Sequence, residues 1–445
     1  MNHFQRKLYP LASIAAGVCT LAVALPAAAI DLTNADGTWK FSLNGNVNVD
    51  YIYSNCESVN SVKTISDVGG ACAGTATSNS TSSVANGLLP AAFVFGVSTT
   101  QNGIDMSAHL GVYPGVVTND GGSPNLQANS SGNVALGTTG LDVRQVYMTF
   151  GNKDMGTFEL GRNIGLFEQD IILNDMTLLG VGGPGGAATP NPANTTLGGI
   201  GFGYIYTDWL SQIDYTTPDF GGANFTLGIF DPLNSLTGPG EAANKPAPGF
   251  HAKFAWKATF DDVKVAFSVA GLEQEQKYST AAVVTTGGIV TTPAGTGSWQ
   301  GTGVDVFGKV DIAGFELVGG GYYAKGLGTT GIFIFGADAD GNARTSYGYL
   351  VQGTYKVGPV KFGVNYGVSR LAFTNEADRI ADPFLVAANE KVTGGVYYDL
   401  TKNLMLLGEV SWVQDIAHTN SISADGNIGN SNTGVTGNVG VFLAF

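Results

Sequence analysis

Charged residues, cysteine and histidine are scarce in this sequence, and long apolar runs are missing after its first 25 residues. Only 13% of the 445 residues are charged, and there are three cysteines and four histidines. A soluble domain usually has about 25% charged residues. A membrane-spanning helix needs about 20 consecutive apolar residues. The sequence therefore matches neither an ordinary soluble domain nor a protein that crosses a membrane with helices.

The motifs of common enzymes are also missing. Neither Gly-x-Ser-x-Gly nor His-Glu-x-x-His occurs in the chain. Residues 303–310 approach the pattern of a phosphate-binding loop, but Val310 stands where that loop has a metal-binding hydroxyl. We therefore expect no catalytic activity, cofactor or metal, and hydrolysis assisted by His109 or His251 is the enzymatic alternative.

Acidic side chains outnumber basic ones. The chain has 35 Asp and Glu against 21 Lys and Arg, a net charge of −14. Such a protein repels the phosphate backbone of nucleic acids. Nucleic acid is therefore not an expected partner.

The N-terminal segment has the pattern of an export signal. Arg6 and Lys7 precede an apolar run from Leu11 to Leu25, and residues 27–29 are three alanines. A charged start, a short apolar core and small residues at the cleavage site are typical of a secretory signal peptide. We expect residues 1–29 to be removed, leaving residues 30–445 as a single domain.

The remaining chain is rich in glycine and alternates apolar with polar residues. Along residues 38–54, aromatic and aliphatic side chains such as Trp39, Phe41 and Tyr51 alternate with polar ones such as Asn48 and Asp50. A period of two places these sets on opposite faces of a strand. One face suits lipid and the other suits a water-filled lumen.

Sixteen segments show this alternation. The connections between them are alternately long and short, and the short ones are tight turns such as Asn102-Gly103. An open sheet edge would leave backbone groups unpaired in lipid, so the strands must close into a barrel. The predicted fold is an all-β, sixteen-stranded antiparallel transmembrane barrel. Its strands are expected near residues 38–54, 89–100, 104–113, 141–151, 156–163, 209–217, 223–231, 250–260, 263–273, 302–311, 314–324, 346–357, 360–370, 389–400, 403–414 and 434–445. The segments near 141–163 keep their parity only if a β-bulge is present.

Phe445 is the last residue and closes an alternating segment. A terminal aromatic strand of this kind is typical of outer-membrane barrels. We expect Phe445 to serve as the signal to the barrel-assembly machinery during insertion among the outer-membrane lipids of a Gram-negative cell.

Two cysteines, Cys56 and Cys72, follow the predicted signal peptide. Both lie in a Ser/Asn/Gly-rich stretch after the first strand. Cysteines of exported proteins usually pair. Closing a loop of about 16 residues would restrict the unfolded chain by about 3 kcal/mol. We expect a disulfide, with two free thiols as the alternative.

Several short motifs resemble those of the Gram-negative trimeric porins, in particular the neisserial and β-proteobacterial general porins. They are Gly156-Thr157-Phe158-Glu159-Leu160-Gly161-Arg162, the run from Tyr215 to Gly222, Tyr398-Asp399-Leu400-Thr401-Lys402 and the terminal Phe445. The resemblance covers essentially the whole chain after the signal peptide. It implies a homotrimer whose third loop folds into each barrel and narrows it.

By this resemblance, the third loop runs from about residue 164 to 208. It implies acidic residues on the loop and basic residues on the facing wall. The expected acids are Glu168, Asp170 and Asp175. The candidates for the basic wall are Lys40, Arg144, Arg162, Lys253, Lys257, Lys309 and Lys391, with fewer arginines than the family commonly has.

The expected function is passive diffusion of ions and small hydrophilic solutes. Net charge favours cations weakly. A substrate-specific channel and, less favoured, a barrel adhesin are the alternatives. Residues 338–342 approach calcium-loop spacing but lack the downstream glutamate.

Overall fold

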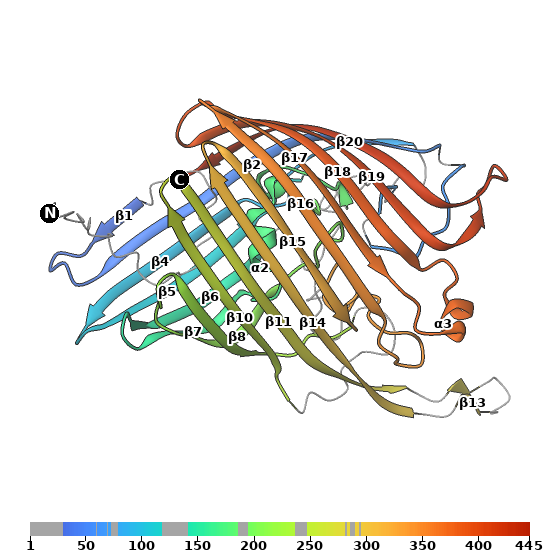
Figure 1. Ribbon diagram of the computed structural model, residues 1–445, viewed down its shortest axis with the longest axis horizontal. Helices are drawn as coiled ribbons and strands as arrows, with labels where there is room; N and C mark the ends of the chain where they lie inside the picture. The colour runs from blue at the N-terminus through green and yellow to red at the C-terminus, as the bar shows by residue number, and fades with distance from the viewer. Residues whose placement is uncertain are drawn as a thin grey trace, which may run out of the picture.

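Sixteen long strands close into an antiparallel barrel in the computed structural model (Figure 1). The structure describes residues 30–58, 60–68, 70–72, 79–117, 141–185, 195–235, 247–280, 283–284, 290–292 and 295–445. The predicted signal peptide, residues 1–29, lies outside the described residues. The sheet has 18 strands, of which β1 (Ile30–Thr33) and β3 (Ser80–Ala85) are short segments paired with β2.

The barrel strands confirm all sixteen predicted segments. They are β2 (Lys40–Cys56), β4 (Ala92–Gln101), β5 (Ile104–Pro114), β6 (Leu141–Asn152), β7 (Gly156–Ile164), β8 (Trp209–Thr216), β9 (Ala223–Phe230), β10 (Gly249–Phe260), β11 (Val263–Thr280), β14 (Gly295–Ile312), β15 (Phe315–Lys325), β16 (Thr345–Val357), β17 (Val360–Leu371), β18 (Val386–Asp399), β19 (Leu404–Ile422) and β20 (Ile428–Ala444). A separate pair, β12 (Val283–Val284) and β13 (Val290–Thr292), lies between β11 and β14.

Four strands exceed their predicted lengths by five residues or more. The pair β11 and β14 continues to Thr280 and Gly295, and the pair β19 and β20 continues to Ile422 and Ile428. The prediction ended these strands where the apolar alternation ends. Backbone pairing does not need lipid, so the hairpins extend beyond that point with polar side chains.

The barrel closes through its first and last long strands. β2 pairs with β20, with Val47 opposite Leu443. Beyond the ladder, the Gly45 N–H donates to the Phe445 carbonyl at 2.8 Å, and the Phe445 N–H donates back at 3.0 Å. The Phe445 ring also lies 5.5 Å from that of Phe93 on β4. The terminal aromatic residue is therefore part of the closing seam.

The two faces of the strands carry different side chains. On β2, Val49, Tyr51 and Tyr53 are exposed on the outer face, whereas Asn48 and Asp50 are buried on the inner face. Tight turns join the strands at one end. At Asn102-Gly103 both residues have positive φ, 52° and 78°, as a two-residue hairpin turn with right-handed strand twist requires. Long connections lie at the other end.

The strands depart from regular geometry at two places, and each departure changes what lies inside the barrel. The ladder between β5 and β6 shifts between Gly111 and Val112, so that Arg144 and Gln145 are both buried. This is the predicted bulge. The strand predicted from residue 89 begins at Ala92, and the segment between β3 and β4 turns inward, where the Leu88 N–H donates to the Gly180 carbonyl at 2.8 Å.

Helices are few and short in the described part of the chain. They are α2 (Gln169–Asn174), the 3-10 helix η1 (Met176–Leu179) and α3 (Glu376–Ala381). None of the described helices has the length and hydropathy needed to cross a membrane.

Candidate functional site

The connection between β7 and β8 is the longest one with extensive contacts to the barrel wall. Its described parts, residues 165–185 and 195–208, include α2 and η1. α2 contacts β15, and η1 contacts β17. These strands are far from β7 and β8 in the order of the sheet. We call these two described parts the third-loop segment.

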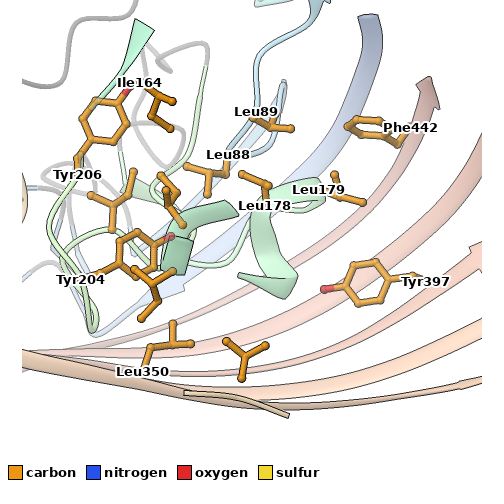
Figure 2. Packing of buried hydrophobic residues seen from close by; sticks show 14 of the residues in the cluster. Leu88, Leu89, Ile164, Leu178, Leu179, Tyr204, Tyr206, Leu350, Tyr397 and Phe442 are labelled. Carbon is orange, nitrogen blue, oxygen red and sulfur yellow. The ribbon is translucent and has the colours of Figure 1, made fainter. Parts of the chain in front are cut away.

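Apolar side chains attach the third-loop segment to the inner face of the wall. Leu178, Leu179 and Tyr204 of the segment share one buried cluster with Leu350 on β16, Tyr397 on β18 and Phe442 on β20 (Figure 2). These apolar residues lie on the inward face of the strands, where the alternation pattern predicts polar side chains in contact with water. The apolar contact is worth roughly 1.5–3 kcal/mol for each fully buried large side chain, so it contributes much of the attachment.

Glu409 on β19 holds the same segment by hydrogen bonds. One of its carboxylate oxygens accepts from the backbone N–H of Val181 at 2.8 Å and of Gly182 at 2.9 Å. The other accepts from the Tyr397 hydroxyl at 2.5 Å. Gly180 is required beside this carboxylate, because a Cβ there would lie 2.2 Å from it. Glu409 therefore binds the backbone of the segment directly.

Asp175, predicted to line the channel, is instead a structural residue. Its carboxylate accepts from the Thr177 N–H at 2.9 Å, capping η1, and from the Tyr204 hydroxyl at 2.8 Å. The Asn365 amide donates to it from β17 at 3.2 Å. The residue is 4% exposed. The prediction of a water-facing acid is wrong here, because the carboxylate is used to connect η1, Tyr204 and the wall.

Glu168 is also buried, with 1% exposure. It has a left-handed backbone, φ 61°, and its N–H donates to the Asp305 carboxylate on β14 at 2.9 Å. Burial, followed by repulsion from Asp305, raises the pKa of Glu168 well above its usual value. This acid does not face water, and the expectation that it would is wrong.

Asp170 is the predicted acid that keeps access to the lumen. Its carboxylate lies 3.3 Å from Lys253 Nζ on β10, and its side chain is 23% exposed. Burial acts to raise the pKa of Asp170, but Lys253, a hydrogen bond from Ser268 and the more distant Lys257 outweigh it and lower the pKa. One predicted acid thus faces two predicted basic residues.

Lys309 forms a second link between the wall and α2. Its Nζ donates to the Asn174 side chain at 3.2 Å and lies 2.5 Å from the Glu316 carboxylate on β15. Asp311 is 3.9 Å away. Lys309 therefore lies beside α2, and acids of the wall offset its charge.

The other predicted wall cations have different positions. Lys391 is fully buried, and its Nζ has no hydrogen-bond partner among the described residues, although Asp175 and Glu409 interact with it electrostatically. Arg144 is buried and paired with Asp142 at 3.0 Å. Lys40 is exposed at the first residue of β2. None of these three side chains lies free at the candidate constriction.

Arg162 is on the wrong face for a wall cation. In the ladder it lies opposite Val146 and Ser211. Val146 and Ser211 are exposed on the outer face. Directly opposed residues share a face, so Arg162 points outward. The prediction placed Arg162 in a strand, and membership of a strand does not fix which face a side chain takes.

The structure also adds residues that the sequence analysis missed. Glu409, Gln352 and Ser369 all bind the third-loop segment. Gln352 accepts from the Met176 N–H at 2.6 Å, and Ser369 accepts from the Gly203 N–H at 3.0 Å. Their signal in the sequence is inward parity alone, which they share with many lumen residues. Only the path of the segment distinguishes them.

The outer connections carry two further features. Cys56 and Cys72 form a disulfide with Cα atoms 5.4 Å apart. In the segment once compared with a calcium loop, Asp338 accepts from the Asn342 N–H at 2.8 Å and the Asn342 amide at 2.9 Å, and also from Thr374. Its oxygens are thus used within the protein. Across the described residues, no group of three or more His, Cys, Asp or Glu side chains lies close enough together to hold a metal ion.

Comparison with known proteins agrees with this architecture. A family model described as Gram-negative porin matches residues 12–415. The chain is similar to the outer membrane channel DcaP of Acinetobacter baumannii, with 12% identity, a TM-score of 0.57, and coverage of 93% of this chain and 99% of that chain. It is similar to the anion-selective porin from Comamonas acidovorans, with 15% identity, a TM-score of 0.55 and coverage of 92% and 100%.

A third similar structure is Salmonella typhi OmpF in complex with daunomycin, with 14% identity, a TM-score of 0.51, and coverage of 94% of this chain and 100% of that chain. At these identities the structural similarity shows the fold. No curated protein sequence matches the chain.

Proposed function

This chain belongs to the Gram-negative porin family and forms an outer-membrane channel for passive diffusion, and from that premise we propose that the third-loop segment narrows the channel. The observation that carries the proposal is the pairing of Asp170 and Lys253, which joins α2 to the wall on β10 at 3.3 Å. Ions and small hydrophilic solutes pass beside this contact, selected by size and charge. No chemical step is involved.

The proposed selectivity for ions is weak. Of the three acids expected at the constriction, Glu168 and Asp175 are buried. The remaining Asp170 has Lys253 beside it and Lys257 near it. Paired charges produce a local transverse field but little net charge. The strongly acidic composition of the whole chain therefore has little effect at the narrow point, because exposed charges are screened over about 8 Å at physiological salt.

We propose a homotrimer of the general-porin type, as the resemblance of the short motifs implies. The exposed apolar side chains of the outer face, such as Val49 and Val439, suit contact with lipid or with another copy. A terminal Phe445 in the closing seam supports its role in barrel assembly.

Single-channel recording tests the function. The purified protein, inserted in planar bilayers, is expected to give large steady current steps and a small reversal potential under a salt gradient. Sugars and organic anions at low concentration are expected to leave the steps unchanged. Block by one class of solute would instead identify a substrate-specific channel, and absence of conductance would overturn the proposal.

A further inference from the structure

Three side-chain oxygens lie without partners where the first outer connection meets the wall. Asp67 belongs to the connection after β2, and Asp415 and Asn389 face each other across the pair β19 and β18. Among the described residues, Asp67 Oδ2, Asp415 Oδ1 and Asn389 Oδ1 have no hydrogen-bond partner. Asp415 and Asn389 are 3% and 2% exposed. Buried oxygens without partners are costly and call for an occupant.

The three residues are in mutual contact. The Asn389 amide donates to Asp67 Oδ1 at 3.1 Å, which places its carboxamide against the carboxylate. A Cβ at Gly70 would lie 2.3 Å from Asp415 Oδ2 and 3.1 Å from Asp67 Oδ2. The two carboxylates therefore converge on one point beside Gly70. The Ala71 N–H donates to Asp415 Oδ2 from the same turn.

No basic side chain balances the two carboxylates. Among the described residues, no Lys, Arg or His forms an ion pair with Asp67 or Asp415. Two lysines on the same connection and on β18 have other partners: Lys63 Nζ donates to the Ser61 carbonyl, and Lys391 interacts with Asp175 and Glu409. Two carboxylates with buried oxygens and no basic group to balance their charge require a cation or a shared proton.

We propose that Asp67, Asp415 and the Asn389 carbonyl oxygen bind a divalent cation of the calcium class. Calcium prefers carboxylate and amide oxygens and completes its shell with water. The cation joins the first outer connection to the wall at the outer mouth of the channel. Of the three ligands, Asp67 lies within the loop closed by Cys56 and Cys72. The backbone of this loop is also held to the rest of the protein by the Ser66 N–H, which donates to the Phe384 carbonyl at 2.8 Å.

Isothermal titration of the folded, disulfide-intact protein, free of lipopolysaccharide, with calcium chloride tests this site. We expect one ion per chain, with a Kd on the order of 10⁻⁴–10⁻³ M as in extracellular calcium modules. Asp415→Asn and Asp67→Asn are expected to weaken binding at least about tenfold. Asp340→Asn, which changes an exposed acid on another outer connection, is the matched control and is expected to bind like the wild type.

A second measurement uses the unmodified protein, so that it does not depend on how well the variants fold. Calcium is expected to slow proteolysis of the first outer connection at least threefold, and a chelator to restore the fast rate. Absence of calcium binding to the folded wild type at 10 mM would overturn the proposal. A proton shared by Asp67 and Asp415 would then balance their charge. Equal binding by Asp415→Asn, Asp67→Asn and wild type would also overturn it.

Discussion

Replacing Glu409 by alanine is the most direct test of how the third-loop segment is held. The carboxylate accepts two backbone N–H groups of the segment, at 2.8 and 2.9 Å, and the Tyr397 hydroxyl at 2.5 Å. Alanine removes all three acceptor contacts. The apolar contacts of Leu178 and Leu179 remain, so we expect the barrel to fold and the segment to stay mostly attached.

The expected magnitude follows from the two backbone hydrogen bonds. Each is worth about 1–3 kcal/mol when its acceptor is charged or when a buried donor is left unpaired. Losing both weakens attachment by about 2–6 kcal/mol. Since about 1.4 kcal/mol corresponds to a tenfold change, the detached population of the segment should rise at least about 30-fold.

The assay is single-channel recording of Glu409→Ala beside Glu409→Gln. The glutamine variant keeps an oxygen that can accept from Val181 and Gly182, so it is the matched control. We expect Glu409→Ala to show more frequent current fluctuations and brief steps of larger conductance, with Glu409→Gln close to wild type. The thermal unfolding of the barrel should change little in either.

One result would refute this reasoning. If Glu409→Ala folds and its current noise equals that of the wild type, the two hydrogen bonds do not hold the segment. Apolar packing would then be sufficient by itself. Equal noise in Glu409→Ala and Glu409→Gln, both above wild type, would instead assign the effect to the charge.

Three further changes test other parts of the molecule. Asp170→Asn should shift the reversal potential toward anions and Lys253→Gln toward cations, because the two side chains form one ion pair; shifts of the same sign would contradict the assignment. Replacing Cys56 and Cys72 by serine removes a cross-link over 16 residues, which restricts the unfolded chain by about 3 kcal/mol. We expect faster proteolysis of the first outer connection and an unchanged gel shift of the folded barrel. Unchanged proteolysis would contradict this role of the disulfide. Deleting Phe445 removes two hydrogen bonds that close the barrel, at 2.8 and 3.0 Å. We expect outer-membrane fractions to contain less folded protein for this deletion than for Phe445→Tyr. Equal yields of folded protein would refute the role of Phe445 in barrel assembly.

The alternation of residue types determined the strands of this protein. Lipid on one side and water on the other impose a period of two that is readable over ten residues, as in β2 with Tyr51 outside and Asp50 inside. The sequence also predicted a bulge within residues 141–163, because the alternation there cannot be kept in a regular strand. The structure places this bulge beside Arg144. The pairing of Cys56 with Cys72 was readable from export and cysteine count alone.

The lengths of four strands and the roles of the candidate acids were decided by tertiary structure. Polar extensions such as that of β19 look like loop in the sequence, since backbone pairing outside the membrane leaves no apolar pattern. Glu168, Asp170 and Asp175 are equivalent acids in sequence, yet of the three only Asp170 stays partly exposed. Which inward residue meets water depends on where the third-loop segment lies, and contacts such as Tyr204 with Leu350 join residues far apart in the chain. Strand alternation is a local property, whereas covering an inner face is a property of the closed barrel.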